Sequence, residues 1–396
     1  RGNPTVEVEM TISSGTVRTS VPTGASTGKH EVWELRDQGK AYLGLGVEKA
    51  VRNVNTVIAQ KLRGKDCCKQ REIDQLLIKL DGTANKTKMG ANALLAVSLA
   101  CMKAGALASQ IPLHEYIATL SGRKISMPRP FFNVLNGGKH ADSGLALQEL
   151  MIAPNVGSFS KNLQAGSEIY HHLKELLHAK YGAGSTNVGD EGGFVCAKIR
   201  TTAEALDLLM QAVEKAGYKG KVDFALDCAA SGFFQQGKYV LEGRKFSAAQ
   251  LGEWYQELVL KYPIISIEDP FDQEDFEHFA QLRKKTGVQV VGDDLTVTNT
   301  KRIKKALSAG SINCLLLKVN QIGTVSEALE AGQMMFDRKL GVMVSHRSGE
   351  TEDTFIADLA VGLGCGMIKA GAPCRGERVA KYNQLLRIEE GMGRKK

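Results

Sequence analysis

Six apolar runs in the second half of the sequence each end on an ionisable side chain. In chain order these side chains are Asp227, Glu268, Asp293, Lys318, His346 and Lys369. Successive members are separated by about the length of one strand plus one helix. Buried strands rarely end on uncompensated charge so regularly, so the spacing predicts that three acids and three bases meet at one place.

The three acids suggest a metal site. Asp227, Glu268 and Asp293 come without a paired histidine or cysteine, so they form an all-oxygen ligand set. Mg²⁺ prefers such a set, with water or substrate completing its octahedral shell. One strand-end carboxylate by itself more often caps the following helix. Three at neighbouring strand ends favour the metal instead.

The basic residues suggest which reaction the metal would assist. Lys318 is expected near a dication and near Lys369, and like charge lowers the pKa of a lysine until it can act as a general base. A proton next to a carboxylate is too weakly acidic for a lysine alone. The enediolate must be neutralised as it forms, which metal ions can do. The set therefore indicates proton abstraction α to a carboxylate.

The rhythm of the chain after residue 112 explains how these groups could be positioned. Short apolar runs alternate with amphipathic stretches that we expect to be helices, at residues 158–180, 202–216, 247–261, 273–285 and 324–338. Such alternation predicts a parallel sheet, either a closed β/α barrel or a large doubly wound sheet. In a barrel, all six charged side chains would converge at the C-terminal ends of the strands.

Residues 1–112 have a different pattern, which predicts an α+β capping domain. Residues 5–10 alternate polar and apolar side chains, as a half-exposed strand does, and residues 16–21 follow a hairpin signal. Residues 47–108 look helical, and residues 92–106 are apolar enough to be buried. The predicted fold is thus α/β, with this domain followed by a catalytic β/α barrel over residues 113–396.

Composition narrows the class of protein. The 396 residues are 43% hydrophobic and 24% charged, as in soluble globular proteins. We find no apolar run long enough for a membrane span and no signal-like start, and we expect a cytoplasmic protein without a membrane partner. The net charge of +8 is spread along the chain, so no nucleic-acid partner is expected. Eight scattered cysteines lack CxxC spacing, which indicates reduced thiols rather than a zinc site.

Several motifs resemble those of the enolase (phosphopyruvate hydratase) family, in the same order and over essentially the whole chain. They are GDEGGF at 189–194, SIEDPF at 266–271, GDDLTVTN at 292–299, LLLKVNQ at 315–321 and SHRSGETEDT at 345–354. The resemblance implies a glycolytic lyase with an enolase-type barrel. It would interconvert 2-phospho-D-glycerate and phosphoenolpyruvate plus water, as a homodimer with two Mg²⁺ per active site.

The resemblance also implies roles for individual residues. Lys318 would remove the proton from C2, and Glu191 would protonate the departing C3 hydroxyl. The first Mg²⁺ would be held by Asp227, Glu268 and Asp293, and Ser26 would help to bind the second. The implied substrate contacts are Ser26, His140, Glu149, His346, Arg347, Ser348 and Lys369. By themselves, Ser26 would belong to an ordinary turn, His140 to a loop and Glu149 to a strand end.

Two other functions remain open at this point. One is a different proton-abstracting relative, of the mandelate racemase or muconate cycloisomerase type, and the other is a non-catalytic role for the same fold. Arg347 and Ser348 favour the enolase reaction, because they predict a phosphate site that those relatives do not need. Family members usually carry a further N-terminal segment, so we expect a truncated chain. Glu7 and Arg387 match one intersubunit ion pair of the family.

Overall fold

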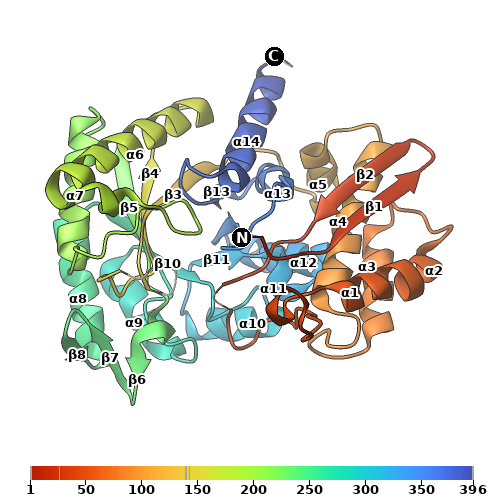
Figure 1. Ribbon diagram of the computed structural model, residues 1–396, viewed down its shortest axis with the longest axis horizontal. Helices are drawn as coiled ribbons and strands as arrows, with labels where there is room; N and C mark the ends of the chain where they lie inside the picture. The colour runs from red at the N-terminus through yellow and green to blue at the C-terminus, as the bar shows by residue number, and fades with distance from the viewer. Residues whose placement is uncertain (1, 26, 139–140, 142, 395–396) are drawn as a thin grey trace.

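The computed structural model describes residues 2–25, 27–138, 141 and 143–394. Eight strands close into a barrel beside a smaller N-terminal part (Figure 1). Around the barrel the order is β10-β11-β12-β13-β3-β4-β5-β9. Their bounds are β3 (Arg129–Asn136), β4 (Glu149–Pro154), β5 (Val222–Asp227), β9 (Ile264–Glu268), β10 (Gln289–Gly292), β11 (Cys314–Leu317), β12 (Gly341–Ser345) and β13 (Gly366–Lys369). The barrel prediction is confirmed, and the doubly wound alternative is wrong.

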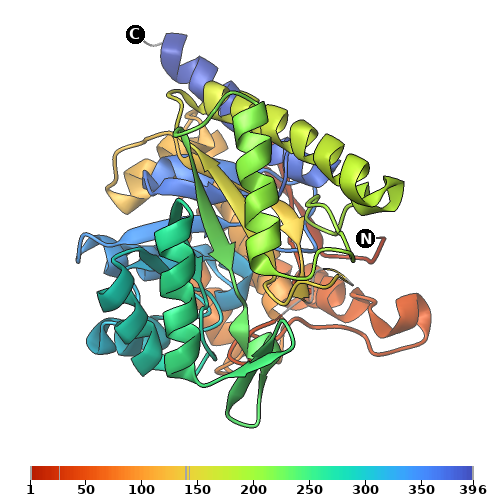
Figure 2. The same ribbon diagram turned by 90° about the vertical axis from the view of Figure 1, so that its left-hand side faces the viewer.

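Helices cover the outside of the barrel, as Figure 2 shows from the side. They are α6 (Phe159–Tyr181), α7 (Thr202–Lys215), α8 (Ala248–Lys261), α9 (Phe276–Thr286), α10 (Thr300–Ala309), α12 (Val325–Phe336), α13 (Phe355–Leu363) and α14 (Gly376–Arg394). All five predicted helices are present close to their predicted bounds. The helices from α6 to α10, and α12, begin at capping side chains; Ser247, for example, accepts a hydrogen bond from Gln250 N and completes a capping box.

One strand departs from the parallel sheet that the sequence predicted. Strand β4 runs antiparallel to both of its neighbours, and its register pairs Glu149 with Asp227 on β5 and with Asn136 on β3. Because β4 is reversed, its first residue lies at the end of the barrel where the other strands finish. We call this end the mouth. The reversal explains how Glu149, at the start of a strand, reaches the same place as the strand-end charges.

The described residues contain further helices and strands. The N-terminal part contains β1 (Glu7–Ile12), β2 (Gly15–Ser20), η1 (Ala41–Gly44), α1 (Glu48–Asn53), η2 (Val54–Ile58), α2 (Ala59–Leu62), α3 (Gln70–Asp81), α4 (Ala91–Ala108) and α5 (Leu113–Ser121). The rest of the chain adds η4 (Ala183–Thr186), η5 (Ala230–Phe233), β6 (Phe234–Gln235), β7 (Lys238–Leu241), β8 (Arg244–Phe246) and α11 (Val319–Ile322).

Helix α4 is the core of the N-terminal part. The β1–β2 hairpin lies across it, and α3 and α5 pack beside it (Figure 1). By length and hydropathy this one helix could cross a membrane, contrary to the expectation from sequence, but 83% of it is buried within the fold. Its composition is therefore that of a helix packed on nearly all sides.

Two contacts fasten the N-terminal part to the mouth. Thr23 and Gly349 exchange backbone hydrogen bonds of 3.0 and 2.8 Å, which hold the loop after β2 against the loop after β12. Asp353 accepts hydrogen bonds from Thr19 Oγ1 and Lys103 Nζ, both at 2.7 Å. We call residues 22–25 and 27–31 the cover loop, because the bonds between Thr23 and Gly349 hold it at the mouth.

Candidate active site

Lys369, the last residue of β13, lies among three buried acids. Its Nζ is 3.0 Å from Asp227 Oδ2, 3.0 Å from Glu268 Oε2 and 3.1 Å from Glu149 Oε2. Burial lowers the pKa of Lys369, but these carboxylates outweigh burial and hold the pKa well above its ordinary value. Lys369 is therefore a fixed positive charge at the mouth. The structure brings together the predicted Asp227, Glu268 and Lys369, with Glu149 beside them.

Lys318, which directly follows β11, forms a second ion pair at the mouth. Its Nζ is 2.5 Å from Asp293 Oδ2, and Gln321 Nε2 donates to Asp293 Oδ1 at 2.9 Å. Burial is the largest influence on the pKa of Lys318 and lowers it, but the carboxylates of Asp293 and Glu268 together outweigh burial, so the net direction is upward. The expected lowering of the Lys318 pKa depends on a neighbouring dication and stays a prediction, because the nearest charge here is the Asp293 carboxylate.

The acids at the mouth fit a hard divalent cation. Burial, and then Asp227, raise the pKa of Glu268 well above its ordinary value. Burial and Asp293 together raise the pKa of Asp294 to about 7. This much negative charge from oxygen donors alone favours an added cation such as Mg²⁺. Asp269, Asp293 and Asp294 each offer one carboxylate oxygen, and these three oxygens lie within 4.8 Å of one another.

The three predicted metal ligands therefore all lie at the mouth, but they do not yet surround a single point. Asp227, Glu268 and Asp293 come from the neighbouring strands β5, β9 and β10, yet lysines hold them in two separate sets. Asp269 contacts the backbone instead, where its two oxygens accept hydrogen bonds from Asp293 N at 3.1 Å and Asp294 N at 2.6 Å. These bonds fix the backbone that carries Asp293.

Glu191 lies in the loop after α6, on the other side of the same pocket. Asn133 Nδ2 donates to Glu191 Oε2 at 2.8 Å, and His346 Nε2 is 3.5 Å from that oxygen. Burial lowers the pKa of His346 to about 4, so the ring is neutral at pH 7. Burial and Glu191 raise the pKa of Glu149 well above its ordinary value. Two buried carboxyl groups that repel in this way retain a proton between them.

A glycine fixes the position of Glu191. Gly192 has a φ of +83°, and a Cβ there would lie 2.7 Å from the backbone oxygen of Cys374. Only glycine combines that left-handed conformation with so close an approach. The backbone oxygen of Glu191 then accepts a hydrogen bond from Ala372 N at 2.9 Å, so the carboxyl group is presented from a rigid loop.

The two predicted phosphate contacts lie under the cover loop. Arg347 Nη1 and Nη2 contact the carboxylate of Glu31 at 2.9 and 3.0 Å, and Nη1 donates to Asn320 Oδ1 at 2.7 Å. Ser348 Oγ accepts a hydrogen bond from Ala25 N at 2.6 Å. The planar fork of Arg347 is thus held in a carboxylate-binding geometry that would suit phosphate equally. Ser26 and His140 lie outside the described residues.

Sequence reasoning missed Arg378, on α14. Its Nη1 donates to His346 Nδ1 at 2.7 Å and to Arg347 O at 2.7 Å, and its Nη2 donates to Ser348 O at 2.6 Å. The first bond makes His346 Nδ1 an acceptor and leaves the ring proton on Nε2, facing Glu191. The helical spacing of the sequence could have identified Arg378, because Arg378 and Lys381 share one buried face of α14 with Tyr382 and Leu385.

Glu31 was missed as well. It belongs to the cover loop, far in sequence from the barrel, and pairs with Arg347 only because Thr23 and Gly349 join the two loops. A glutamate in a loop carries no sequence signal of such a contact.

Buried acids and lysines at the mouth of a β/α barrel are typical of barrel enzymes that work by acid–base chemistry. The protein-family model of the enolase N-terminal domain matches residues 1–117 of the sequence. The family model of the enolase C-terminal TIM barrel domain matches residues 124–396. The enolase of Methanocaldococcus jannaschii is 55% identical over 395 residues, covering 99% of this chain and 93% of that protein. The chain belongs to the enolase family, as its motifs predicted.

Proposed function

We propose that this chain interconverts 2-phospho-D-glycerate and phosphoenolpyruvate plus water at the barrel mouth. One observation carries the assignment. A single pocket is lined by a candidate base, a candidate acid and a candidate phosphate-binding cation, namely Lys318, Glu191 and Arg347. The reaction needs all three within the length of one three-carbon substrate.

Lys318 is the proposed base for the C2 proton. A divalent cation held by Asp227, Glu268 and Asp293 would neutralise charge on the substrate carboxylate and compete with Lys318 for Asp293. Once released from that ion pair, Lys318 keeps Arg347 and Lys369 as positive neighbours, and both lower its pKa. We take the cation to be Mg²⁺, two per active site, with Ser26 as a ligand of the second.

Glu191 is the proposed acid for the C3 hydroxyl, which leaves as water. The raised pKa of its neighbour Glu149 supports a protonated carboxyl group at this place. Asn133 and neutral His346 support its orientation, because both present N–H groups toward one oxygen of the Glu191 carboxyl group.

The remaining residues hold the substrate. Arg347 and Ser348 would bind the phosphate, for which Glu31 must give up its contact with Arg347. Lys369 would bind the substrate carboxylate, and His346 and His140 would lie near the leaving hydroxyl. The phosphate contacts favour this reaction over racemisation or cycloisomerisation of unphosphorylated acids.

We also propose a quaternary state and a division into domains. Glu7 is half exposed and Arg387 lies on the exposed side of α14, so both are available for an intersubunit ion pair in a homodimer. Sedimentation of the parent and of Glu7→Gln would test that dimer. We place the domain division at residues 112 and 113 and the enzyme in the cytoplasm, with no nucleic-acid or membrane partner required.

The proposal is tested by mixing the protein with 2-phosphoglycerate and Mg²⁺ and following enolpyruvate absorbance in the ultraviolet. Product should appear with the parent chain and be absent with Lys318→Ala, whose circular dichroism should match the parent. The milder Lys318→Arg keeps the charge but not the base, and should also be inactive. Activity in either folded variant would overturn the role of Lys318, and an inactive folded parent would overturn the assignment.

A further inference from the structure

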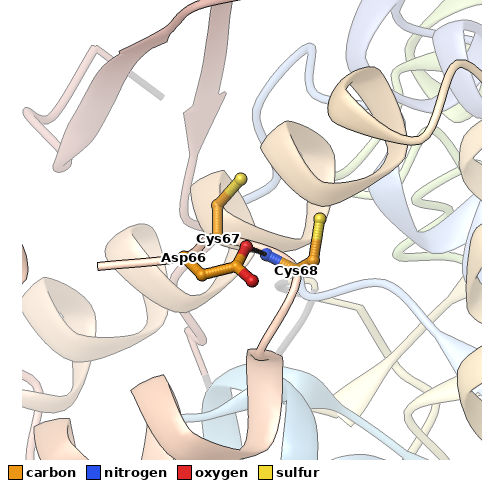
Figure 3. Close-up of side chains that lie close together, drawn as sticks. All are labelled: Asp66, Cys67 and Cys68. Atoms are coloured by element: carbon orange, nitrogen blue, oxygen red, sulfur yellow. Dashed lines mark hydrogen bonds between the residues drawn. The ribbon is translucent and has the colours of Figure 1, made fainter. Parts of the chain in front are cut away.

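A second cluster of ligand atoms lies in the N-terminal part, at the turn between α2 and α3. Asp66, Cys67 and Cys68 each contribute one carboxylate or sulfur atom, and these atoms lie within 4.8 Å of one another. Figure 3 shows both sulfur atoms pointing to the same side of the turn, with the carboxylate of Asp66 beside them. Three consecutive residues thus present two thiols and one carboxylate together.

Backbone contacts fix the shape of this turn. Asp66 Oδ1 accepts a hydrogen bond from Cys68 N at 2.9 Å, drawn as the dashed line in Figure 3. Lys69 N donates to Asp66 O at 3.2 Å, and Tyr116 Oη donates to Cys68 O at 3.3 Å. These contacts hold the backbone on both sides of Cys67 and so fix where the two thiols leave the chain.

The turn is open to solutes. Five of the eight cysteines are buried, whereas Cys67 and Cys68 are both partly exposed and Asp66 is exposed. Within the described ranges, the Asp66 carboxylate has no lysine or arginine within ion-pair distance. The carboxylate therefore keeps an oxygen for a further ligand.

More sulfur lies nearby. Cys67 lines a groove of about 380 Å³ together with Cys101 and Met10, between α2 and the β1 strand. Cys101 Sγ and Met10 Sδ are 4.0 Å apart. Soft thiolate and thioether donors select metals such as zinc, cadmium and copper(I) over magnesium. The chemistry of this region is thus opposite to that of the barrel mouth.

We propose that Asp66, Cys67 and Cys68 form a binding site for a thiophilic divalent cation such as Zn²⁺ or Cd²⁺, separate from the active site. Two thiolates and one carboxylate provide three ligands of a tetrahedral shell, and water completes it. Both thiols release their protons on binding. The complex carries one net negative charge, and the exposed Lys65 and Lys69 flank the turn in the sequence.

The test is a titration of the folded protein with Cd²⁺, with tris(2-carboxyethyl)phosphine as a thiol-free reductant and Mg²⁺ in excess at the barrel mouth. Thiolate ligation gives a sulfur-to-metal absorption band in the ultraviolet that oxygen ligands do not give. The band should saturate at one equivalent. Cys67→Ser or Cys68→Ser should weaken binding by more than about 100-fold, because even outer-shell partners are worth about 10- to 100-fold.

Two further variants sharpen the result. Asp66→Asn should weaken binding by at least about 10-fold, because a ligand charge is lost, while leaving the band itself in place, since both thiolates remain. Cys374→Ser is the matched control, because Cys374 is also a partly exposed free thiol and lies far along the chain on the barrel. It should bind Cd²⁺ as the parent does.

The proposal is overturned if the folded parent gives no thiolate band. It is also overturned if Cys67→Ser and Cys68→Ser keep the parent affinity, or if Cys374→Ser loses it. Turnover of 2-phosphoglycerate by the same variants is a separate readout and should match the parent. Failure of the thiol site would therefore leave the proposed function untouched, and the reverse holds too.

Discussion

The barrel mouth and the turn at residues 66–68 both gather ligand atoms, but the chain builds them in opposite ways. The mouth collects Asp227, Glu268 and Lys369 from strands far apart in sequence and buries them. The turn uses three neighbours and leaves them partly exposed. The first set therefore depends on the whole fold, and the second depends on a few backbone hydrogen bonds.

The energetic difference follows from burial. Taking a charge out of water costs several kcal/mol, and an ion pair offsets that cost only when its geometry is good. At the mouth, each of the two lysines has carboxylates at 2.5 to 3.1 Å. At the turn, thiols can remain neutral until a cation arrives. A loss of tertiary contacts should therefore harm the mouth far more than the turn.

Removal of metal should have the largest effect. Treatment with EDTA should abolish turnover of 2-phosphoglycerate, because the acids at the mouth are proposed to act through a divalent cation, and added Mg²⁺ should restore it. Cys67→Ser should respond in the same way, since its thiol takes no part. Continued turnover after chelation would contradict the proposal that the mouth acts through a cation such as Mg²⁺, and with it the contrast to the thiolate site at the turn.

Replacing the proposed acid comes next. Glu191→Gln should lower kcat by about 10²- to 10⁴-fold, the usual contribution of general acid catalysis, because an amide cannot deliver the proton. The amide can still contact Asn133, so the circular dichroism and the Cd²⁺ band should stay at parent values. A variant that retained most of its kcat would show that Glu191 is not the acid.

A change beneath the cover loop should have a smaller effect. In Gly349→Ala the new Cβ would lie 2.5 Å from Thr23 Cγ2 and 2.7 Å from Thr23 O, so the loop must move. We expect kcat/KM to fall by about 100-fold, since a shift of about 1 Å at a catalytic site costs that much. Gly393→Ala, where a Cβ meets open space, is the control. Equal kinetics of the two variants would mean that the loop does not position the substrate.

The tie between the two parts of the molecule should affect stability. Burial raises the pKa of Asp353, but Lys103 and Thr19 outweigh it, and the net direction is downward. Asp353→Asn should therefore lower the unfolding free energy at pH 7 by about 3 kcal/mol. A lowered carboxyl pKa stabilises above the unfolded value and ceases to stabilise as pH falls through the folded value, so parent and variant should converge in acid.

Urea unfolding of the parent and of Asp353→Asn at several pH values measures this difference. Asp66→Asn is the matched control, because its carboxylate is exposed at the turn, and it should unfold as the parent does. A constant gap between parent and Asp353→Asn down to pH 3 would contradict the assignment.

The sequence predicted most of the fold because its signals are periodic. Helical stretches such as residues 247–261 carry both an apolar face and a capping residue, and α8 spans Ala248–Lys261. The strand-end charges predicted the mouth for the same reason. The sequence did not predict the reversal of β4, because a run of apolar residues predicts a buried strand but not the direction in which that strand runs. The absence of a helical stretch between residues 136 and 149 was the available signal.

Parts of the site needed atomic distances. The pKa of Lys318 was predicted to fall beside a dication, whereas in the protein alone the 2.5 Å contact with Asp293 helps to raise it. The sequence shows which residues are neighbours along the chain, but it does not show which charged group lies nearest to Lys318 in the folded protein. The cysteines were interpreted by their spacing alone, which does not include a carboxylate one residue away. The turn became a candidate only once three side chains were placed together.

The pairing of β13 with β3 has a consequence for how the molecule is made. Strand β3 is synthesised early and folds back on β4 through a short connection, whereas its other edge waits for β13, more than two hundred residues later. Such distant closure is slow and leaves an open edge meanwhile. Lys369 arrives on that last strand, so Asp227, Glu268 and Glu149 stay without their shared cation until the ring closes. Closure of the barrel and neutralisation of the mouth are thus one event during folding.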